Sequence, residues 1–288
     1  MAGRRIKKIV TGQATQDGAG VKLVRVLSNQ TVNDFDPFLM LDAFDSTNPD
    51  DYIRGFPWHP HRGIETITYL VEGIIDHGDS LGHSGRIESG GCQWMTAGSG
   101  IIHQEMPQPS PRMLGLQFWL NLPRDQKMVP PKYHGADGDQ VPEVKGQGAR
   151  VRVIAGEYQG TAGALTADHI KATFIDVALN GEAEWSFQTD PEATVYLYIL
   201  EGGADFDEHS GPVAKKHAVL FEPGDEIKVK AGPQGARFVL CAASPLREPV
   251  AWGGPIVMNT REELNQAFEE LDKGTFIKTD QPGAADLY

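Results

Sequence analysis

The feature that most constrains the fold of this chain is an internal repeat. Residues 66–73 read TITYLVEG, and residues 195–202, 129 positions later, read VYLYILEG. Both segments are rich in β-branched and aromatic residues and end in glycine, which predicts a strand followed by a turn. Similar sequence at a long spacing is typical of duplicated structural units. The chain is therefore predicted to contain two similar β-rich halves.

Two shorter matches extend this repeat. Ser89-Gly90 resembles Pro223-Gly224, and Ala97-Gly98 resembles Ala231-Gly232, each at a spacing of 134. The change from 129 to 134 predicts a five-residue insertion in the second half, which a surface loop would tolerate.

The length of 288 residues also favours two domains. We predict a first barrel over residues 1–135, a Pro-, Gly- and Asp-rich linker over 136–150, and a second barrel over 151–288. The only clear helix lies at the end of the second predicted domain. Thr260 and Glu263 fit a capping box at its start, and Gly274 fits its end.

Charge and composition exclude several classes of function. The net charge of −13 disfavours direct nucleic-acid binding, because such binding requires a basic surface. No apolar run is long enough to span a membrane, and the N-terminus lacks the apolar core of a signal peptide. Cys92 and Cys241 are too few for a disulfide framework and are expected to be buried thiols. A cytoplasmic setting is expected.

The sharpest chemical signal is a pair of motifs about 40 residues apart. His59 and His61 form an HxH pair, and His103 and Glu105 form an HxE pair. Residues i and i+2 of a strand point to the same face, so two adjacent strands would bring three imidazoles and one carboxylate together. This set suits a divalent ion such as Fe, Mn, Co, Ni, Cu or Zn better than Mg or Ca. On an octahedral ion, four protein ligands leave two positions open; a closed tetrahedral structural zinc is the alternative.

The repeat predicts that only one half carries this site. At a spacing of 129, His59 and His61 correspond to Gln188 and Asp190. At a spacing of 134, His103 and Glu105 correspond to Arg237 and Val239. These are not a ligand set, and a cation at Arg237 would repel a metal. Other motifs are incomplete: GSGIIH lacks the last glycine of a dinucleotide-binding loop, and no GxSxG hydrolase motif occurs.

The motifs resemble those of the cupin superfamily and, more closely, of the pirin family. The resemblance lies in HPHRGIETITYLVEG, GCQWMTAGSGIIHQEM and PLREPV…GGPIVMNT, and it covers nearly the whole chain. It implies an all-β bicupin: two facing jelly-roll barrels with a short C-terminal helix and a metal in the first barrel only. The pirin pattern implies Fe(II) bound by His59, His61, His103 and Glu105. Glu65, at the usual cupin carboxylate position, would then be structural or support a ligand.

Two functions follow from this resemblance as hypotheses. The first is a metal-dependent dioxygenase of the quercetin 2,3-dioxygenase type, which opens a flavonol ring with O2 and releases CO. Glu105 would be both ligand and general base, and no substrate contact can be named from the sequence. The alternative is an iron-containing, redox-switched interaction protein, a pirin-like co-regulator with a protein partner and little turnover. The acidic net charge disfavours the basic surface of the nuclear co-regulators in this family.

Overall fold

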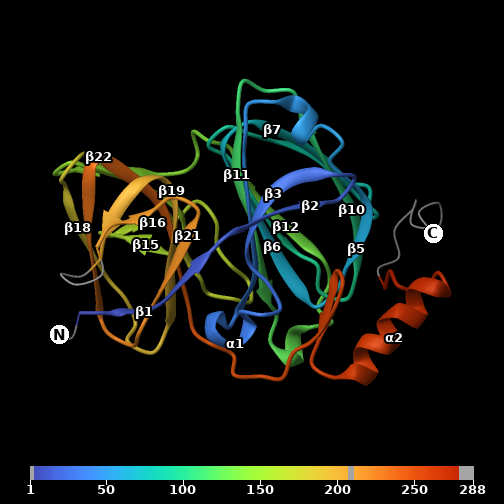
Figure 1. Ribbon diagram of the computed structural model, residues 1–288. Helices are drawn as coiled ribbons and strands as arrows, with labels where there is room; N and C mark the ends of the chain where they lie inside the picture. The colour runs from blue at the N-terminus through green and yellow to red at the C-terminus, as the bar shows by residue number, and fades with distance from the viewer. Residues whose placement is uncertain (1–2, 207–210, 279–288) are drawn as a thin grey trace. The chain divides into compact units, whose positions relative to one another are not determined.

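The computed structural model describes residues 3–206 and 211–278, which form two compact β-rich units (Figure 1). We call them the first and the second barrel. The first barrel contains residues 14–32, 38–139 and the segment from 246 to the end of the described chain. The second barrel contains the residues up to 13, residues 33–37 and residues 140–245. The helix α1 (Val32–Phe35) lies where the chain passes from one unit to the other.

The first barrel has two antiparallel sheets. The larger sheet runs in the order β12 (Lys132–Ala136), β9 (Cys92–Thr96), β6 (Ile64–Glu72), β11 (Met113–Asn121), β4 (Phe38–Ser46), β3 (Val21–Leu27) and β2 (Gln13–Asp17). The smaller sheet runs in the order β5 (Phe56–His61), β10 (Ile101–Gln108), β7 (Ile74–Asp79) and β8 (Ser84–Glu88). Short 3-10 turns lie at Pro49–Asp51 and Arg124–Gln126.

The second barrel is built around one nine-stranded sheet. Its main order is β1 (Ile6–Thr11), β21 (His217–Phe221), β19 (Thr194–Asp205), β22 (Glu226–Ala243), β17 (Thr173–Leu179), β14 (Ala149–Ala155) and β13 (Glu143–Gly146). β18 (Glu184–Gln188) pairs with β22, and β20 (Val213–Ala214) pairs with β19. A small hairpin joins β15 (Glu157–Tyr158) to β16 (Thr161–Ala162).

The predicted repeat is confirmed in the strand order. The run β9-β6-β11-β4-β3 of the first barrel has the same order as β21-β19-β22-β17-β14 of the second. The TITYLVEG segment lies in β6, with its glycine directly after the strand, and the VYLYILEG segment lies in β19; these are the second strands of the two runs. The matches at a spacing of 134 are wrong, however. Ser89-Gly90 precede β9, whereas Pro223-Gly224 follow β21, the counterpart of β9.

The division of the chain differs from the contiguous halves that the sequence suggested. β1 pairs with β21, so the start of the chain belongs to the second barrel. Residues after 245 return to the first barrel, although residues 151–288 were predicted to form one domain. Part of the predicted linker is strand: it includes the end of β12, all of β13 and the start of β14, which pairs with β13. Strand pairing between distant segments overrides continuity along the chain here.

The returning segment from 246 to 278 is called the C-terminal arm. It contains a hairpin of β23 (Ala251–Gly253) and β24 (Ile256–Met258), followed by α2 (Arg261–Asp272) (Figure 1). The predicted capping box is present, since Thr260 Oγ1 accepts from Glu263 N and the Glu263 carboxylate accepts from Thr260 N. Leu264 and Ala267 are the buried side chains of α2, and they pack on β24. Within the described chain, no helix has the length and apolar character needed to cross a membrane.

Candidate metal centre

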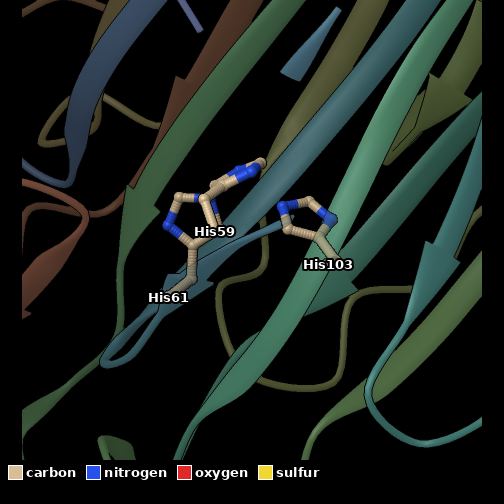
Figure 2. A group of neighbouring side chains, drawn as sticks. All are labelled: His59, His61 and His103. Atoms are coloured by element: carbon tan, nitrogen blue, oxygen red, sulfur yellow. The ribbon is translucent and has the colours of Figure 1, made fainter. Parts of the chain in front are cut away.

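Three histidines meet inside the first barrel because β5 and β10 lie side by side. The two strands are antiparallel, and His59 is directly opposite His103. His61 lies two residues further along β5, on the same face as His59. The ring centroids of His59 and His103 are 4.4 Å apart, and those of His61 and His103 are 5.0 Å apart. Figure 2 shows the three rings turned toward one another.

Hydrogen bonds fix the tautomers of the two β5 histidines. The Nδ1 atom of His59 lies 2.8 Å from the carbonyl oxygen of Pro57, and that of His61 lies 3.0 Å from the carbonyl oxygen of Pro255. Carbonyl oxygens only accept, so each Nδ1 carries the proton and each Nε2 is left with a lone pair. The two Nε2 atoms are 3.1 Å apart. Two lone pairs at this distance repel each other unless a proton or a cation lies between them.

Burial keeps the inner two rings neutral. Burial, followed by the neighbouring His59, lowers the pKa of His61 to about 3. Burial and the adjacent imidazoles also lower the pKa of His103 well below its usual value. Neither ring nitrogen of His103 has a hydrogen-bond partner, although the side chain is buried. Neutral imidazoles with unsatisfied nitrogens are suited to bind a metal ion.

The fourth predicted ligand, Glu105, lies outside the tight histidine group and is hydrogen-bonded to other side chains. A register shift between His103 and Glu105 interrupts the pairing of β10 with β5. The carboxylate oxygens of Glu105 accept from Gln117 Nε2 at 2.8 and 2.7 Å, and one of them also accepts from Thr68 Oγ1 at 3.1 Å. Among the described residues, the group whose potential ligand atoms all lie within 4.8 Å of one another contains the three histidines and not Glu105.

Other polar side chains of the first barrel form contacts of their own, apart from the histidine cluster. Glu65 is buried and accepts from the hydroxyl of Thr96 at 2.8 Å, so it is not part of the cluster. His77 Nε2 accepts from the side-chain amide of Gln93 at 2.8 Å. His83, on a neighbouring turn, is instead paired with Asp79.

The cluster opens onto a cavity of about 510 Å³ in the first barrel. Its apolar lining includes Met40, Phe56, Trp119 and Trp252, and its polar lining includes Asp17, Arg25, Asp42 and Gln117 together with His59 and His61. The indole of Trp119 contacts both the edge of His61, at 4.9 Å between centroids, and the indole of Trp252, at 5.9 Å. A volume of this size and a mixed lining are typical of small-molecule sites.

The C-terminal arm forms part of this cavity, which sequence reasoning missed. Trp252 and Pro255 line it, and the carbonyl of Pro255 orients His61. The arm is fixed beside the cluster by Arg62, whose guanidinium donates to the carbonyl oxygens of Ser99 and Phe276 and pairs with Glu270 at 2.7 Å. The sequence feature that could have indicated this is GGPIVMNT, which is part of the family resemblance. The predicted domain border places this segment in the second barrel.

The second barrel places rings and aliphatic side chains where the first carries imidazoles. β18 pairs with the first part of β22, as β5 pairs with β10, and its two aromatic positions lie opposite Val229 and Ile227. These positions are Trp185 and Phe187, whose rings are parallel within 2° at 5.9 Å.

The predicted counterparts of the ligands were therefore partly wrong. Arg237 and Val239 lie in the later part of β22, which pairs with β17 and β19 as β11 pairs with β4 and β6. They correspond to β11 and not to β10. Arg237 is paired with Asp176, with Nε and Nη2 each bonded to one carboxylate oxygen.

Two β-barrels of common topology, one with a histidine cluster in its interior, define a protein of the cupin class. Family comparison matches residues 20–120 to Pirin and residues 174–277 to the Pirin C-terminal cupin domain. The chain belongs to the pirin family.

Individual relatives cover almost the whole chain. A "Pirin-like protein" of Caulobacter vibrioides is 44% identical over 276 residues, covering 95% of this chain and 99% of the relative. A Pseudomonas aeruginosa protein named "Putative quercetin 2,3-dioxygenase" is 40% identical, covering 94% of this chain and 97% of its own. The crystal structure of quercetin 2,3-dioxygenase from Acinetobacter baumannii superposes with a TM-score of 0.88 at 29% identity, covering 96% of this chain and 99% of the other.

Proposed function

We propose that this protein is a metal-dependent dioxygenase of the quercetin 2,3-dioxygenase type, acting on a flavonol-like aromatic substrate. The observation that carries the proposal is the cluster of neutral imidazoles at the wall of an aromatic-lined cavity. The names of the Pseudomonas and Acinetobacter relatives support the same chemistry.

The proposed ligands are His59, His61, His103 and Glu105. The facing Nε2 lone pairs of His59 and His61 and the unsatisfied nitrogens of His103 fit a cation better than they fit one another. Fe(II) is proposed first, and Mn, Co, Ni, Cu and Zn suit the same nitrogen-rich set. Both cysteines are buried free thiols, which supports the reducing, cytoplasmic setting assumed for Fe(II).

When bound, the ion acidifies the flavonol 3-hydroxyl and orients it toward O2. The residues of the chain perform the remaining tasks. Glu105 accepts the hydroxyl proton, and Gln117 and Thr68 fix the orientation of its carboxylate. Trp119 and Trp252 provide flat apolar surface for the substrate rings and exclude water from them. Overall, both atoms of O2 enter the opened product and one ring carbon leaves as CO.

The test is anaerobic loading with Fe(II), followed by quercetin and O2. We expect CO release and loss of the flavonol absorbance, and neither from a His59→Ala/His61→Ala variant. If no divalent metal supports turnover, the dioxygenase proposal is overturned. A partner protein retained only in one iron oxidation state would then favour the redox-switched interaction hypothesis.

A further inference from the structure

A row of polar side chains crosses the larger sheet of the first barrel and enters the cavity. In the strand register, Thr68 of β6 lies opposite Gln117 of β11, Gln117 opposite Asp42 of β4, and Asp42 opposite Arg25 of β3. Residues opposite each other in adjacent strands point to the same face. The role of Gln117, at one end of the row, is explained by its hydrogen bonds to the carboxylate of Glu105. The other end, Asp42 and Arg25, has no task in the proposed chemistry.

Arg25 and Asp42 form a two-pronged ion pair. Arg25 Nε and Nη2 donate to the two carboxylate oxygens of Asp42 at 2.9 and 2.6 Å, and Nη2 also reaches Asp17 at 2.6 Å. Burial raises the pKa of Asp42 and its contact with Arg25 opposes that shift, while the same contact raises the pKa of Arg25. Because both oxygens of Asp42 accept from the guanidinium, we treat the pair as ionised.

The pair retains hydrogen-bonding capacity toward the cavity. The three hydrogen bonds of Arg25 to the carboxylates use Nε and Nη2, which leaves the two N–H groups of Nη1 for a ligand oxygen. Asp17 and Asp42 retain lone pairs that can accept a ligand O–H. One cation and two carboxylates carry a local charge of −1, so a neutral hydroxyl fits this end of the cavity and a carboxylate does not.

The same cavity connects this pair to the histidine cluster. Its lining includes His59 and His61 as well as Arg25, Asp42 and Asp17, with aromatic side chains among them. A planar ligand with one oxygen at the histidines therefore meets polar side chains at a second place.

We propose that Arg25, Asp42 and Asp17 form a hydroxyl-binding subsite that selects neutral aromatic substrates carrying a phenolic group remote from the reacting hydroxyl. The inference rests on the proposed function, because it assumes that the reacting hydroxyl lies at His59, His61 and His103. The subsite binds the remote phenol through two hydrogen bonds. A carboxylate accepts one from the phenol O–H, and Arg25 Nη1 donates the other to the phenol oxygen.

The test compares two ligands that differ only at the remote ring. Calorimetry on the Zn(II)-loaded protein in the absence of O2, so that no turnover occurs, gives the affinity for 3-hydroxyflavone and for 3,3′,4′-trihydroxyflavone. A hydrogen bond to a charged group predicts that the trihydroxy ligand binds about tenfold more tightly or better. A 4′-carboxylate analogue should bind no better than 3-hydroxyflavone.

A double substitution then assigns the preference to the subsite. Arg25→Met/Asp42→Leu removes both charges together, so that no buried charge is left alone. We expect it to reduce the preference to less than about threefold while 3-hydroxyflavone affinity is kept. The matched control is Arg237→Met/Asp176→Leu, which removes a similar ion pair from the second barrel and should leave the preference intact. Arg25→Lys, which keeps the charge but loses the fork, should also weaken the preference and serves if the double variant is unstable.

The outcomes separate the two proposals. Equal affinity of the two flavonols for the unsubstituted protein, or a preference that survives both Arg25 variants, overturns the subsite alone. No binding of either flavonol to the metal-loaded protein overturns both the subsite and the proposed function.

Discussion

The two barrels share a strand order but differ in what fills them. Inside the first barrel, β5 and β10 present three imidazoles, and Glu105 lies with its partner Gln117 beside them. The corresponding strands of the second barrel present Trp185 and Phe187 against valine and isoleucine. Imidazoles and charged side chains line the cavity of the first barrel, whereas the cavity of the second barrel, of about 1030 Å³, has the rings of Tyr158, Trp185 and Phe206 in its wall.

This difference shows how a duplicated fold can divide its tasks. Buried polar groups cost free energy unless each finds a partner, so the first barrel needs a supporting hydrogen bond for nearly every polar side chain of its site. The ring group of the second barrel satisfies its indole within itself, since Trp185 Nε1 donates to the hydroxyl of Tyr158, and contributes stability by burial and close packing. We therefore expect substitutions in the first barrel to change chemistry and equivalent ones in the second to change stability.

The largest expected effect comes from the β5 histidines. His59→Ala/His61→Ala removes two of the proposed ligands, so bound metal should fall to background. Activity should fall by more than about 10–100-fold, which is the typical loss when only a residue that supports a metal ligand is removed. Elemental analysis and circular dichroism of protein purified without a chelating tag measure metal and fold. His217→Ala in the second barrel should change neither. Unfolding of the double variant would mean that the cluster is structural, as in a closed zinc site.

The converse substitution is Trp185→Ala in the second barrel. It removes one ring from a group of three that contact one another, the other two being Phe187 and Tyr158, and it should lower the free energy of unfolding by about 3–5 kcal/mol. Urea denaturation measures this loss, and metal content at low urea should remain unchanged. Trp185→Phe, which keeps a ring, should cost less. Metal loss from the folded Trp185→Ala variant would contradict the division of tasks.

The sequence predicted the strands and the histidine cluster better than it predicted the borders of the barrels. The β-branched and aromatic residues of 66–73 and 195–202 predict two equivalent strands, and an HxH pair on a strand must point both imidazoles to one side. These are local rules with a period of two residues. They suffice to bring His59 and His61 together, and pairing with β10 adds His103.

What the sequence missed depends on long-range contacts. Nothing local to Pro255 indicates that its carbonyl would accept from His61, 194 residues earlier. Likewise, β1 pairs with β21, although the two strands lie far apart in the sequence. The alignment of Arg237 with a ligand failed because β22 is continuous and serves as the counterpart of both β10 and β11.

A smaller effect is expected where the C-terminal arm meets the first barrel. Arg62 is buried, its guanidinium lies 4.2 Å from the ring centroid of Phe276, and it pairs with Glu270. Arg62→Met should cost about 3 kcal/mol, because it leaves two carbonyl oxygens and part of a carboxylate without a donor. Loosening the arm should also speed metal release to a chelator, since Pro255 orients His61.

The matched control lies on the same helix. Lys273→Met breaks the exposed ion pair with Glu269 and should change stability by less than about 0.5 kcal/mol. If Arg62→Met is destabilised but releases metal at the unchanged rate, the arm supports the fold without positioning the site.

The smallest effect is a pH dependence set by Lys127. This side chain is buried and donates from Nζ to the carbonyl oxygens of Gly63 and Val257 and to Asn121 Oδ1. Burial lowers its pKa to about 7, although the carboxylates of Glu248 and Glu263 oppose the shift. The unfolded chain, with an ordinary lysine pKa, holds its proton to higher pH. It therefore binds more protons than the folded protein above pH 7, and stability rises with pH.

Between pH 7 and pH 8 this difference contributes about 1 kcal/mol to the free energy of unfolding. Urea denaturation at the two pH values measures the slope, and Lys127→Met, which cannot titrate, should lack that contribution whatever its absolute stability. The opposing argument is that three oxygen acceptors match the three donors of an ammonium group and favour the charged form. If those acceptors outweigh burial, the protein and Lys127→Met will show the same slope. The first barrel would then hold a charged lysine where its C-terminal arm docks, in keeping with the other polar side chains of its interior.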